Sequence, residues 1–228
     1  MDHVSHLKRS LFTLNITAVK DKLSDISNRF SIDINVIKER YKIMNKNGSL
    51  REILASCNIE VYEGIVPNLA KLKPNSIDLF YSESCLQRIP IGDLNKIFGI
   101  LPNILSKNAV SFHRLDTKDF NAIYFSRLWG LNYLKFSDFT WSLLTSKKFN
   151  NQNRSREFEF IKYLESAGLK TIYVESYLKK EDIEKLKKFN LAKRFQNMPL
   201  EEIAVIASKI ISSKYYDGET KRVQVNDF

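Results

Sequence analysis

Stretches of alternating or continuous apolar residues recur along the chain, and they predict β-strands separated by helices. Five stretches rich in β-branched and aromatic residues predict strands, at 10–17, 59–64, 76–83, 109–116 and 170–178. The segment "AVIASKII", at 204–211, is a candidate sixth strand. Strands that alternate with helices predict an α/β fold with a mainly parallel sheet.

The intervals between these strands carry apolar residues at helical spacing. Helices are expected at 19–44, where "SIDIN" can interrupt the pattern, at 49–56, 91–105 and 155–167, and in the charged segment 177–189. The second helix has Ser49 and Glu52 at the spacing of a capping box. The third is expected to break near Pro102, and the fourth to end at Gly168.

Length and composition favour one globular domain. The 228 residues, 43% of them hydrophobic, can bury a single sizeable core. The longest apolar runs have the length of strands, so no membrane span is expected, and the first ten residues lack the apolar core of a signal peptide. Cys57 and Cys85 give neither a metal-ligand spacing nor a disulfide framework. We therefore expect a cytoplasmic protein without a metal site.

The net charge of +10 raises the question of nucleic-acid binding. Much of the positive charge, however, lies on expected helices. In the segment 177–189 the lysines alternate with Glu181, Asp182 and Glu184, which is the pattern of a solvated helix face. The chain is also rich in Lys, Asn and Ile, a bias that AT-rich coding produces without functional demand. Nucleic acid is therefore not the expected partner.

Several short motifs follow one another in an order that is similar to a known family. The segment "LKPNSIDLFYSESCLQRIPIGDL" (72–94) holds a turn, a strand and the start of a helix, and "AVSFHRLD" (109–116) follows it. Then come "LNYLKFSDFTW" (131–141) and "QNRSREFEFIKYLESAGLK" (152–170). Together these motifs resemble the second half of class I S-adenosylmethionine-dependent methyltransferases, in particular a bacterial branch. The resemblance covers a core of about 10–214 in a single domain 1–228, with a flexible tail expected at 215–228.

The resemblance implies a Rossmann-like sheet of strand order 3-2-1-4-5-7-6, mainly parallel, with helices on both faces. It implies S-adenosylmethionine as the cofactor and an unknown small molecule as the methyl acceptor. In this correspondence "SLFTLNIT" is the second strand, and Asn15 occupies the position of an acidic residue that binds the ribose hydroxyls. Ser82 and Glu83 stand where the cofactor and substrate edges meet. The candidate cofactor-binding residues are therefore Asn15, Ser82 and Glu83.

The correspondence also has gaps. The first strand of the family, and the glycine-rich loop where the chain passes close to the cofactor, have no counterpart in this sequence. The adenine-side position falls at about Val66, and Gln87 and Arg88 replace the usual Glu-His pair. We therefore expect a truncated sheet that lacks the first strand. Either the neighbouring strands close up, or an upstream segment, a partner chain or the short N-terminal piece fills the slot, because unpaired strand edges in a core are costly.

His113, Asp116 and Asp119 are the candidate catalytic residues. They place an imidazole and two carboxylates at the carboxyl end of an expected strand, where a base could remove a proton from the acceptor. The alternative for His113 is a partly buried, hydrogen-bonded histidine, and the alternative for Asp116 is a cap for the next segment. The sequence is compatible with either the catalytic or the structural role for His113 and Asp116.

Three arginines near these positions carry further expectations. Arg114 alternates to the face of the strand opposite His113, so it is expected to be structural. Arg154 and Arg156, together with Asn153, either bind an anion or cap the helix that follows them.

Two functions follow from these observations. The first is methyl transfer from S-adenosylmethionine to an acceptor oxygen, nitrogen or carbon. The second is a degenerate or truncated methyltransferase-like domain that binds no cofactor and acts as an interaction module or is inactive. The order of motifs favours the first. The missing glycine loop and the residues Asn15 and Val66 favour the second, because each would weaken binding of the same ligand.

Overall fold

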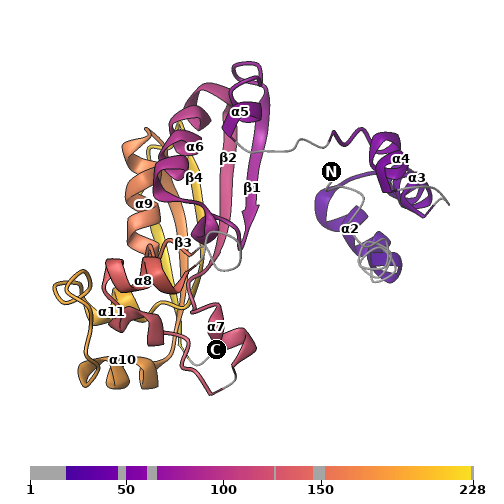
Figure 1. Cartoon of the computed structure of the whole chain (residues 1–228). Coiled ribbons are helices and arrows are strands. Elements are labelled where there is room, and N and C mark those ends of the chain that lie inside the picture. Colours follow the sequence, from indigo (N-terminus) through magenta and orange to yellow (C-terminus); the bar gives the residue numbers. More distant parts are fainter. Residues whose placement is uncertain (1–18, 46–49, 61–65, 126, 146–151, 227–228) are drawn as a thin grey trace. The chain divides into compact units, whose positions relative to one another are not determined.

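The structure is a computed structural model, and it describes residues 19–45, 50–60, 66–125, 127–145 and 152–226 (Figure 1). The chain falls into two compact units, Met1–Asn68 and Leu69–Phe228. The expected strand 10–17, with Asn15, lies outside the described residues. That residues 1–228 act as one domain stays a prediction.

The N-terminal unit is helical over most of its described residues. Its elements are η2 (Lys20–Lys22), α2 (Leu23–Phe30), α3 (Ile34–Met44) and α4 (Leu50–Ser56). The interruption at "SIDIN" occurs, because α2 ends at Ser31 with a φ of 52° and Asp33 then caps α3 by accepting a hydrogen bond from Asn35 N at 2.7 Å. Ser49 lies outside the described residues, as do 61–64 of the expected strand 59–64, while Ile59 and Glu60 are not in a strand.

The C-terminal unit is built on a five-stranded sheet of order β1-β2-β4-β3-β5. The strands are β1 (Ile77–Glu83), β2 (Leu105–Asp116), β3 (Lys170–Leu178), β4 (Ala207–Ser213) and β5 (Lys221–Asn226). β1 pairs with β2 in parallel and β3 with β5 in parallel, whereas β4 is antiparallel to both β2 and β3. Four strands thus point the same way, which confirms the mainly parallel α/β sheet. The order β1-β2-β4-β3 is the 4-5-7-6 part of the order that the resemblance implies.

Helix α6 (Ile91–Ile104) leads directly into β2. The expected break near Pro102 is wrong, because the helix continues through Pro102 to Ile104. Leu94, Ile97, Phe98 and Leu101 on this helix are buried, each at most 1% exposed. Their packing outweighs the roughly 3 kcal/mol that an internal proline costs a helix. The following strand accordingly starts at Leu105, four residues before its expected start.

Shorter helices lie before β1 and between the strands that follow it. They are α5 (Val66–Leu69), η3 (Leu86–Arg88), α7 (Asn121–Tyr124), η4 (Asn132–Lys135), α8 (Asp138–Leu144), α9 (Glu157–Ser166), α10 (Lys180–Lys187) and α11 (Leu200–Ala204). After α9 the chain turns at Gly168, whose φ of 85° is a conformation that glycine adopts without strain. This agrees with the expected end of that helix. The sixth strand candidate is β4, which starts at Ala207, separated by two residues from the end of α11 at Ala204, and continues to Ser213.

The sheet extends beyond Lys214, where the core was expected to end. Residues 221–226 form β5, which pairs with β3 from Tyr173–Lys221 to Leu178–Asn226. The residues of this strand alternate between Arg or Gln and Val, a period-two pattern in a stretch too short and polar to stand out in the sequence. Part of the expected tail therefore belongs to the sheet.

The two faces of the sheet differ in what covers them. On one face the ring of Phe98 from α6 lies 5.9 Å from the ring of His113, and Ser176 of β3 donates a hydrogen bond to Glu157 of α9. On the other face Leu79 and Tyr81 are 58% and 54% exposed. We call these the helix face and the open face. In the described part of this unit, α6 and α9 lie on the same face, and no helix covers Leu79 and Tyr81 (Figure 1).

Candidate functional site

A row of charged side chains crosses the open face near the carboxyl ends of β1, β2 and β3. The strand register pairs Glu83 with Arg114, Arg114 with Lys209, and Lys209 with Glu175. Residues directly opposite each other on neighbouring strands point to the same face. Arg114 Nη1 lies 3.1 Å from Glu83 Oε1, and Lys209 Nζ lies 3.0 Å from Glu175 Oε1. The row therefore has two cations at its centre and one carboxylate at each side.

A pocket opens one row further toward the strand ends. There the register pairs Asp116 with Ala207, and Ala207 with Tyr177. The methyl group of Ala207 is too short to fill the space between its larger neighbours. The resulting cavity, which we call the site pocket, has a volume of about 310 Å³ and is lined by Ser84, Arg114, Leu115, Asp116, Lys118, Tyr177, Ala207, Ser208 and Lys209.

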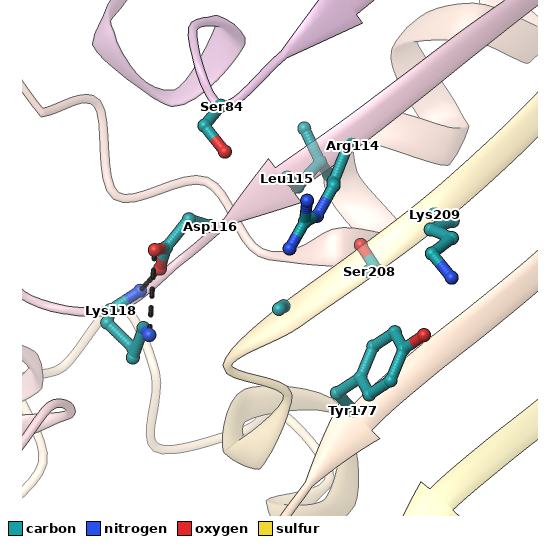
Figure 2. Close-up of a pocket in the computed structure, with 9 residues that line it drawn as sticks. Ser84, Arg114, Leu115, Asp116, Lys118, Tyr177, Ser208 and Lys209 are labelled. Carbon is teal, nitrogen blue, oxygen red and sulfur yellow. Dashed lines mark hydrogen bonds and ion pairs between the residues drawn. The ribbon is translucent and has the colours of Figure 1, made fainter. Parts of the chain in front are cut away.

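The lining residues of the site pocket come from the ends of β2, β3 and β4 and from the segments that directly follow β1 and β2. Figure 2 shows Asp116 and Lys118 on one side, Arg114 and Lys209 on the other, and Tyr177 beside Lys209. Asp116 and Arg114 belong to β2, Lys209 to β4 and Tyr177 to β3. Because β4 is reversed, its start meets the carboxyl ends of β2 and β3. The reversed strand thus brings a lysine to an edge where the other strands bring an acid and a phenol.

Glu175 holds the basic side of the site pocket in place. Its carboxylate accepts hydrogen bonds from Lys209 at 3.0 Å, from Tyr173 at 2.8 Å and from Tyr177. Partial burial acts to raise the pKa of this carboxyl, but the hydrogen bonds from Lys209 and Tyr173 outweigh it, and the pKa is lowered. The side chain therefore stays charged and fixes both Lys209 and the Tyr177 ring, whose centroid lies 5.4 Å from Lys209 Nζ.

His113 lies on the helix face and is fully buried. Its Nδ1 lies 2.7 Å from Ser82 Oγ and its Nε2 3.1 Å from Ser111 Oγ, while the rings of Phe80 and Phe98 pack against it at centroid distances of 5.8 and 5.9 Å. Burial lowers the pKa of His113 to about 4. The imidazole is therefore neutral at pH 7, and it is bonded within the core rather than presented to a ligand. This placement corresponds to the structural alternative for His113.

The structure does not bring the three candidate catalytic residues together. Asp116 and His113 are three residues apart on β2, and the alternation of a strand turns them to opposite faces. Asp116 lines the site pocket and accepts a hydrogen bond from Lys118 N at 3.1 Å. Asp119 is 2% exposed, accepts a hydrogen bond from Asn121 N at 2.9 Å, and has a pKa raised by burial. Of the three, Asp116 alone faces the site pocket.

The candidate cofactor residues are also in different surroundings. The Ser82 hydroxyl is buried and bonded to His113, so it does not point to solvent. Glu83 is exposed at the end of β1, where it pairs with Arg114 and accepts a hydrogen bond from Tyr81 at 2.6 Å. Asn15 lies outside the described residues. The Glu83 carboxylate is therefore accessible to a ligand, whereas the Ser82 hydroxyl is not, and their cofactor role stays a prediction.

Arg156 is a structural part of the site that the sequence left open. Its guanidinium is fully buried and donates to the carbonyl oxygens of Thr117 at 3.0 Å and Ile203 at 2.8 Å, to Val205 O and to Tyr133 Oη. Thr117 follows β2 and Val205 precedes β4, so this arginine ties together the two segments that border the site pocket. Its own backbone N–H donates to Glu159 at 2.8 Å at the start of α9, which supports the helix-cap expectation.

The residues that sequence reasoning missed are Lys209 and Tyr177, and Arg114 was expected to be only structural. No local signal could have identified Lys209, because it reaches the site pocket only through the reversed direction and register of β4. The alternation along "HRLD" does place Arg114 and Asp116 on one face. If Asp116 rather than His113 is the residue that faces a ligand, the same alternation predicts that Arg114 faces it too.

Neither a metal-binding cluster nor a membrane-spanning helix is found among the described residues. No group of three or more His, Cys, Asp or Glu residues in the described part could hold a metal ion. The histidines at 3 and 6 lie outside it. Within the same described ranges, no helix is both long and apolar enough to span a bilayer.

The comparison with known proteins gave structural matches only. No protein-family model and no curated protein matches this chain. A candidate sarcosine dimethylglycine methyltransferase from Galdieria sulphuraria is similar over 76% of this chain and 66% of its own, with 14% identity and a TM-score of 0.40. A SAM-dependent methyltransferase from Archaeoglobus fulgidus is similar over 71% of each chain, with 14% identity and a TM-score of 0.39.

A third match is the candidate methyltransferase of Haloferax volcanii in complex with the Trm112 methyltransferase activator. It covers 75% of this chain and 70% of its own, with 10% identity and a TM-score of 0.41. The chain thus spans about two thirds of the length of these proteins. Since all three TM-scores are below 0.5, we base the proposal that follows on the strand order and on the residues of the site pocket.

Proposed function

We propose that this chain is a methyltransferase-like protein that transfers a methyl group from S-adenosylmethionine to a small acceptor bound in the site pocket. The observation that supports this most is the strand order β1-β2-β4-β3, with β4 reversed between β2 and β3. It corresponds to the 4-5-7-6 part of the sheet in the family that the motifs resemble. In α/β sheets, ligands bind beyond the carboxyl ends of the strands, where the site pocket lies.

The residues of the site pocket can bind, orient and deprotonate an acceptor. Asp116 presents a carboxylate oxygen that can accept the proton of an acceptor hydroxyl or amine. Arg114 and Lys209 offer N–H donors that can hold a second group of the same molecule. S-adenosylmethionine would supply an electrophilic methyl group. Glu83 is the described residue that fits contact with this cofactor, through its exposed carboxylate.

The test is calorimetric titration of the full chain with S-adenosylmethionine and S-adenosylhomocysteine. We expect measurable heat and a thermal shift with either ligand, followed by release of S-adenosylhomocysteine when a panel of small amines, alcohols and acids is added. The absence of both heat and a thermal shift at millimolar ligand would contradict the proposal for this polypeptide. A matched Glu83→Gln variant should bind more weakly, because it loses the charge of the carboxylate proposed to contact the cofactor.

A second candidate function is an interaction module that binds no cofactor. The observation that favours it is the Ser82 hydroxyl, which is engaged with His113 rather than available to a ligand. In this case the titration gives no heat, while the site pocket still binds its small-molecule ligand. The two candidates are therefore separated by the same measurement.

A partner chain or upstream segment that completes the sheet remains part of the proposal. It is supported by β1, which has a strand neighbour only on its β2 side in the described sheet. A cytoplasmic location is proposed on the two free cysteines, Cys57 and Cys85, which a reducing compartment preserves. Light scattering of the purified chain measures the first, and cell fractionation measures the second.

A further inference from the structure

Two of the three cations that line the site pocket, Arg114 and Lys209, are placed where the sheet alone would not favour them. The third, Lys118, has its Nζ 3.6 Å from Asp116 Oδ2. Arg114 and Lys209 are directly opposite each other on antiparallel strands. In such a pair the Cβ atoms lie roughly 4.5–5.5 Å apart, and like charges at this spacing destabilise the sheet. Glu83 on β1 and Glu175 on β3 lie at the outer sides of the pair. In this row, no carboxylate lies between the two cations, and we call the space between them the seam.

The flanking carboxylates hold the cations without covering the seam. Glu83 reaches Arg114 through Nη1, one of several donor positions on a guanidinium that carries five N–H groups. Glu175 lies on the far side of Lys209, in β3. The side chains of Arg114 and Lys209 keep exposed fractions of 53% and 35%. Both cations are therefore held in fixed positions and remain open to a ligand from the site pocket.

We propose that the site pocket binds an anionic group of its ligand, a carboxylate or a phosphate, between Arg114 and Lys209. Arginine offers such a group two parallel hydrogen bonds, and lysine offers a point charge. Tyr177, which lines the pocket beside Lys209, offers a stacking surface and a phenol. A bound anion would lie between the two cations and reduce their mutual repulsion, in addition to the carboxylate that each cation already has on its outer side.

Strand β2 sets the distance between this anion and the acceptor oxygen or nitrogen whose proton Asp116 is proposed to remove. Arg114 and Asp116 lie two residues apart on the same face of β2, which corresponds to about 7 Å along a strand. A ligand that reaches both groups has its anion about that far from the hydroxyl or amine that faces Asp116. The ligand class is therefore a small hydroxy or amino acid, or a phosphate monoester of similar length. This assignment of the reacting atom rests on the proposed function, whereas the anion site itself does not.

The test is titration of the full chain with inorganic phosphate and with acetate, each at constant ionic strength maintained with chloride. Two-dimensional NMR and thermal shift provide the readouts. The variants are Arg114→Gln and Lys209→Gln, and the matched control is Lys96→Gln, which removes an exposed lysine paired with Asp93 on α6. All three variants lower the net charge by the same amount.

We expect at least one of the two anions to bind, with shifts in the backbone amides of Ala207 and Ser208. The Arg114→Gln and Lys209→Gln variants should each weaken binding about tenfold or more, while Lys96→Gln should change it less than twofold. Preference for phosphate identifies a phosphate monoester as the ligand, and preference for acetate identifies a carboxylic acid. Equal losses in all three variants, or no binding of either anion, overturn the proposal.

Additional readouts cover misfolding and the link to catalysis. The fold of each variant is checked by thermal unfolding without anion. If Arg114→Gln is unstable, Arg114→Lys replaces it; this variant keeps the charge and should retain part of the anion binding. Anion binding is measured without S-adenosylmethionine. If the anion binds and S-adenosylmethionine does not, the anion site stands and the proposed methyl transfer fails. If the reverse holds, only the anion site fails.

Discussion

The two faces of strand β2 have opposite chemistry although their residues alternate along a single segment. On the helix face, His113 is buried among Phe80, Phe98 and two serines, and its pKa is lowered to about 4. On the open face, Arg114 and Asp116 line the site pocket. His113, which in the sequence looks most like a catalytic base, is therefore part of the core, whereas Arg114 and Asp116 face the site pocket. A charged or titratable residue at a strand end acquires its role from the face to which it points.

The largest expected effect tests the acid on the open face. Asp116→Asn should lower the rate of methyl transfer by roughly 10²- to 10⁴-fold, because the amide cannot accept the proton of the acceptor. The rate is measured as S-adenosylhomocysteine release with the acceptor found in the panel. Asp93→Asn, an exposed acid on α6, serves as the control and should retain full activity. If His113→Asn abolishes the rate in a folded protein while Asp116→Asn retains it, the assignment of the two faces is wrong.

The second effect compares an aromatic residue on each face. Phe98→Ala should destabilise the protein by roughly 3–5 kcal/mol, because Phe98 is 1% exposed and its loss leaves a cavity next to His113. Tyr81→Ala should cost about 1 kcal/mol, mainly from the lost stacking on Phe112 at a centroid distance of 5.5 Å. Urea unfolding measures both. A loss of stability at Tyr81 as large as that at Phe98 would mean that the open face is covered in solution.

The third effect is a pH dependence that belongs to the helix face. The unfolded imidazole of His113 binds a proton below about pH 6.5, whereas the folded one binds it only below about pH 4. Between these values the unfolded state holds more protons, so stability is complete above pH 6.5 and decreases as the pH falls toward 4. The shift amounts to about 3 kcal/mol.

The measurement for His113 is a set of urea unfolding curves at several pH values for the wild type and for His113→Asn. The variant should lack the His113 part of the slope, while carboxyl groups titrate equally in both proteins. Identical slopes between pH 4 and 6.5 would show that the imidazole is accessible to protons in the folded state.

The smallest effect concerns the cation pair on the open face. In a double-mutant cycle of Arg114→Gln and Lys209→Gln, we expect an unfavourable coupling of roughly 0.2–1 kcal/mol in the absence of phosphate. The coupling should vanish in 1 M salt, where screening shortens the reach of surface charges to about 3 Å. A favourable coupling would mean that the two side chains share a carboxylate rather than repel each other, and it would remove one support of the anion site.

Much of the fold could be predicted because it follows from local patterns. The strand 170–178 was predicted at its observed bounds, and the C-terminal end of α9 and the interruption before α3 follow from Gly168 and Asp33. The continuation of α6 through Pro102 could not be predicted, because the apolar contacts that hold it come from the sheet beneath it. Of the candidate site, the sequence could place Asp116 at the end of β2 but not the burial of His113, and the catalytic roles of both stay predictions.

The sequence by itself determined the order of strands and helices, the carboxyl end of β2 as the place of the acidic residues, and the separation of His113 from Arg114 by alternation. Each of these depends on neighbours along the chain. Only the tertiary structure decided that β4 lies reversed between β2 and β3, and therefore that Lys209 stands opposite Arg114 with Tyr177 beside it. Strand direction and register are fixed by packing between segments about 95 residues apart, as for Arg114 and Lys209. No local pattern carries that information, so the basic half of the site pocket exists only in the folded chain.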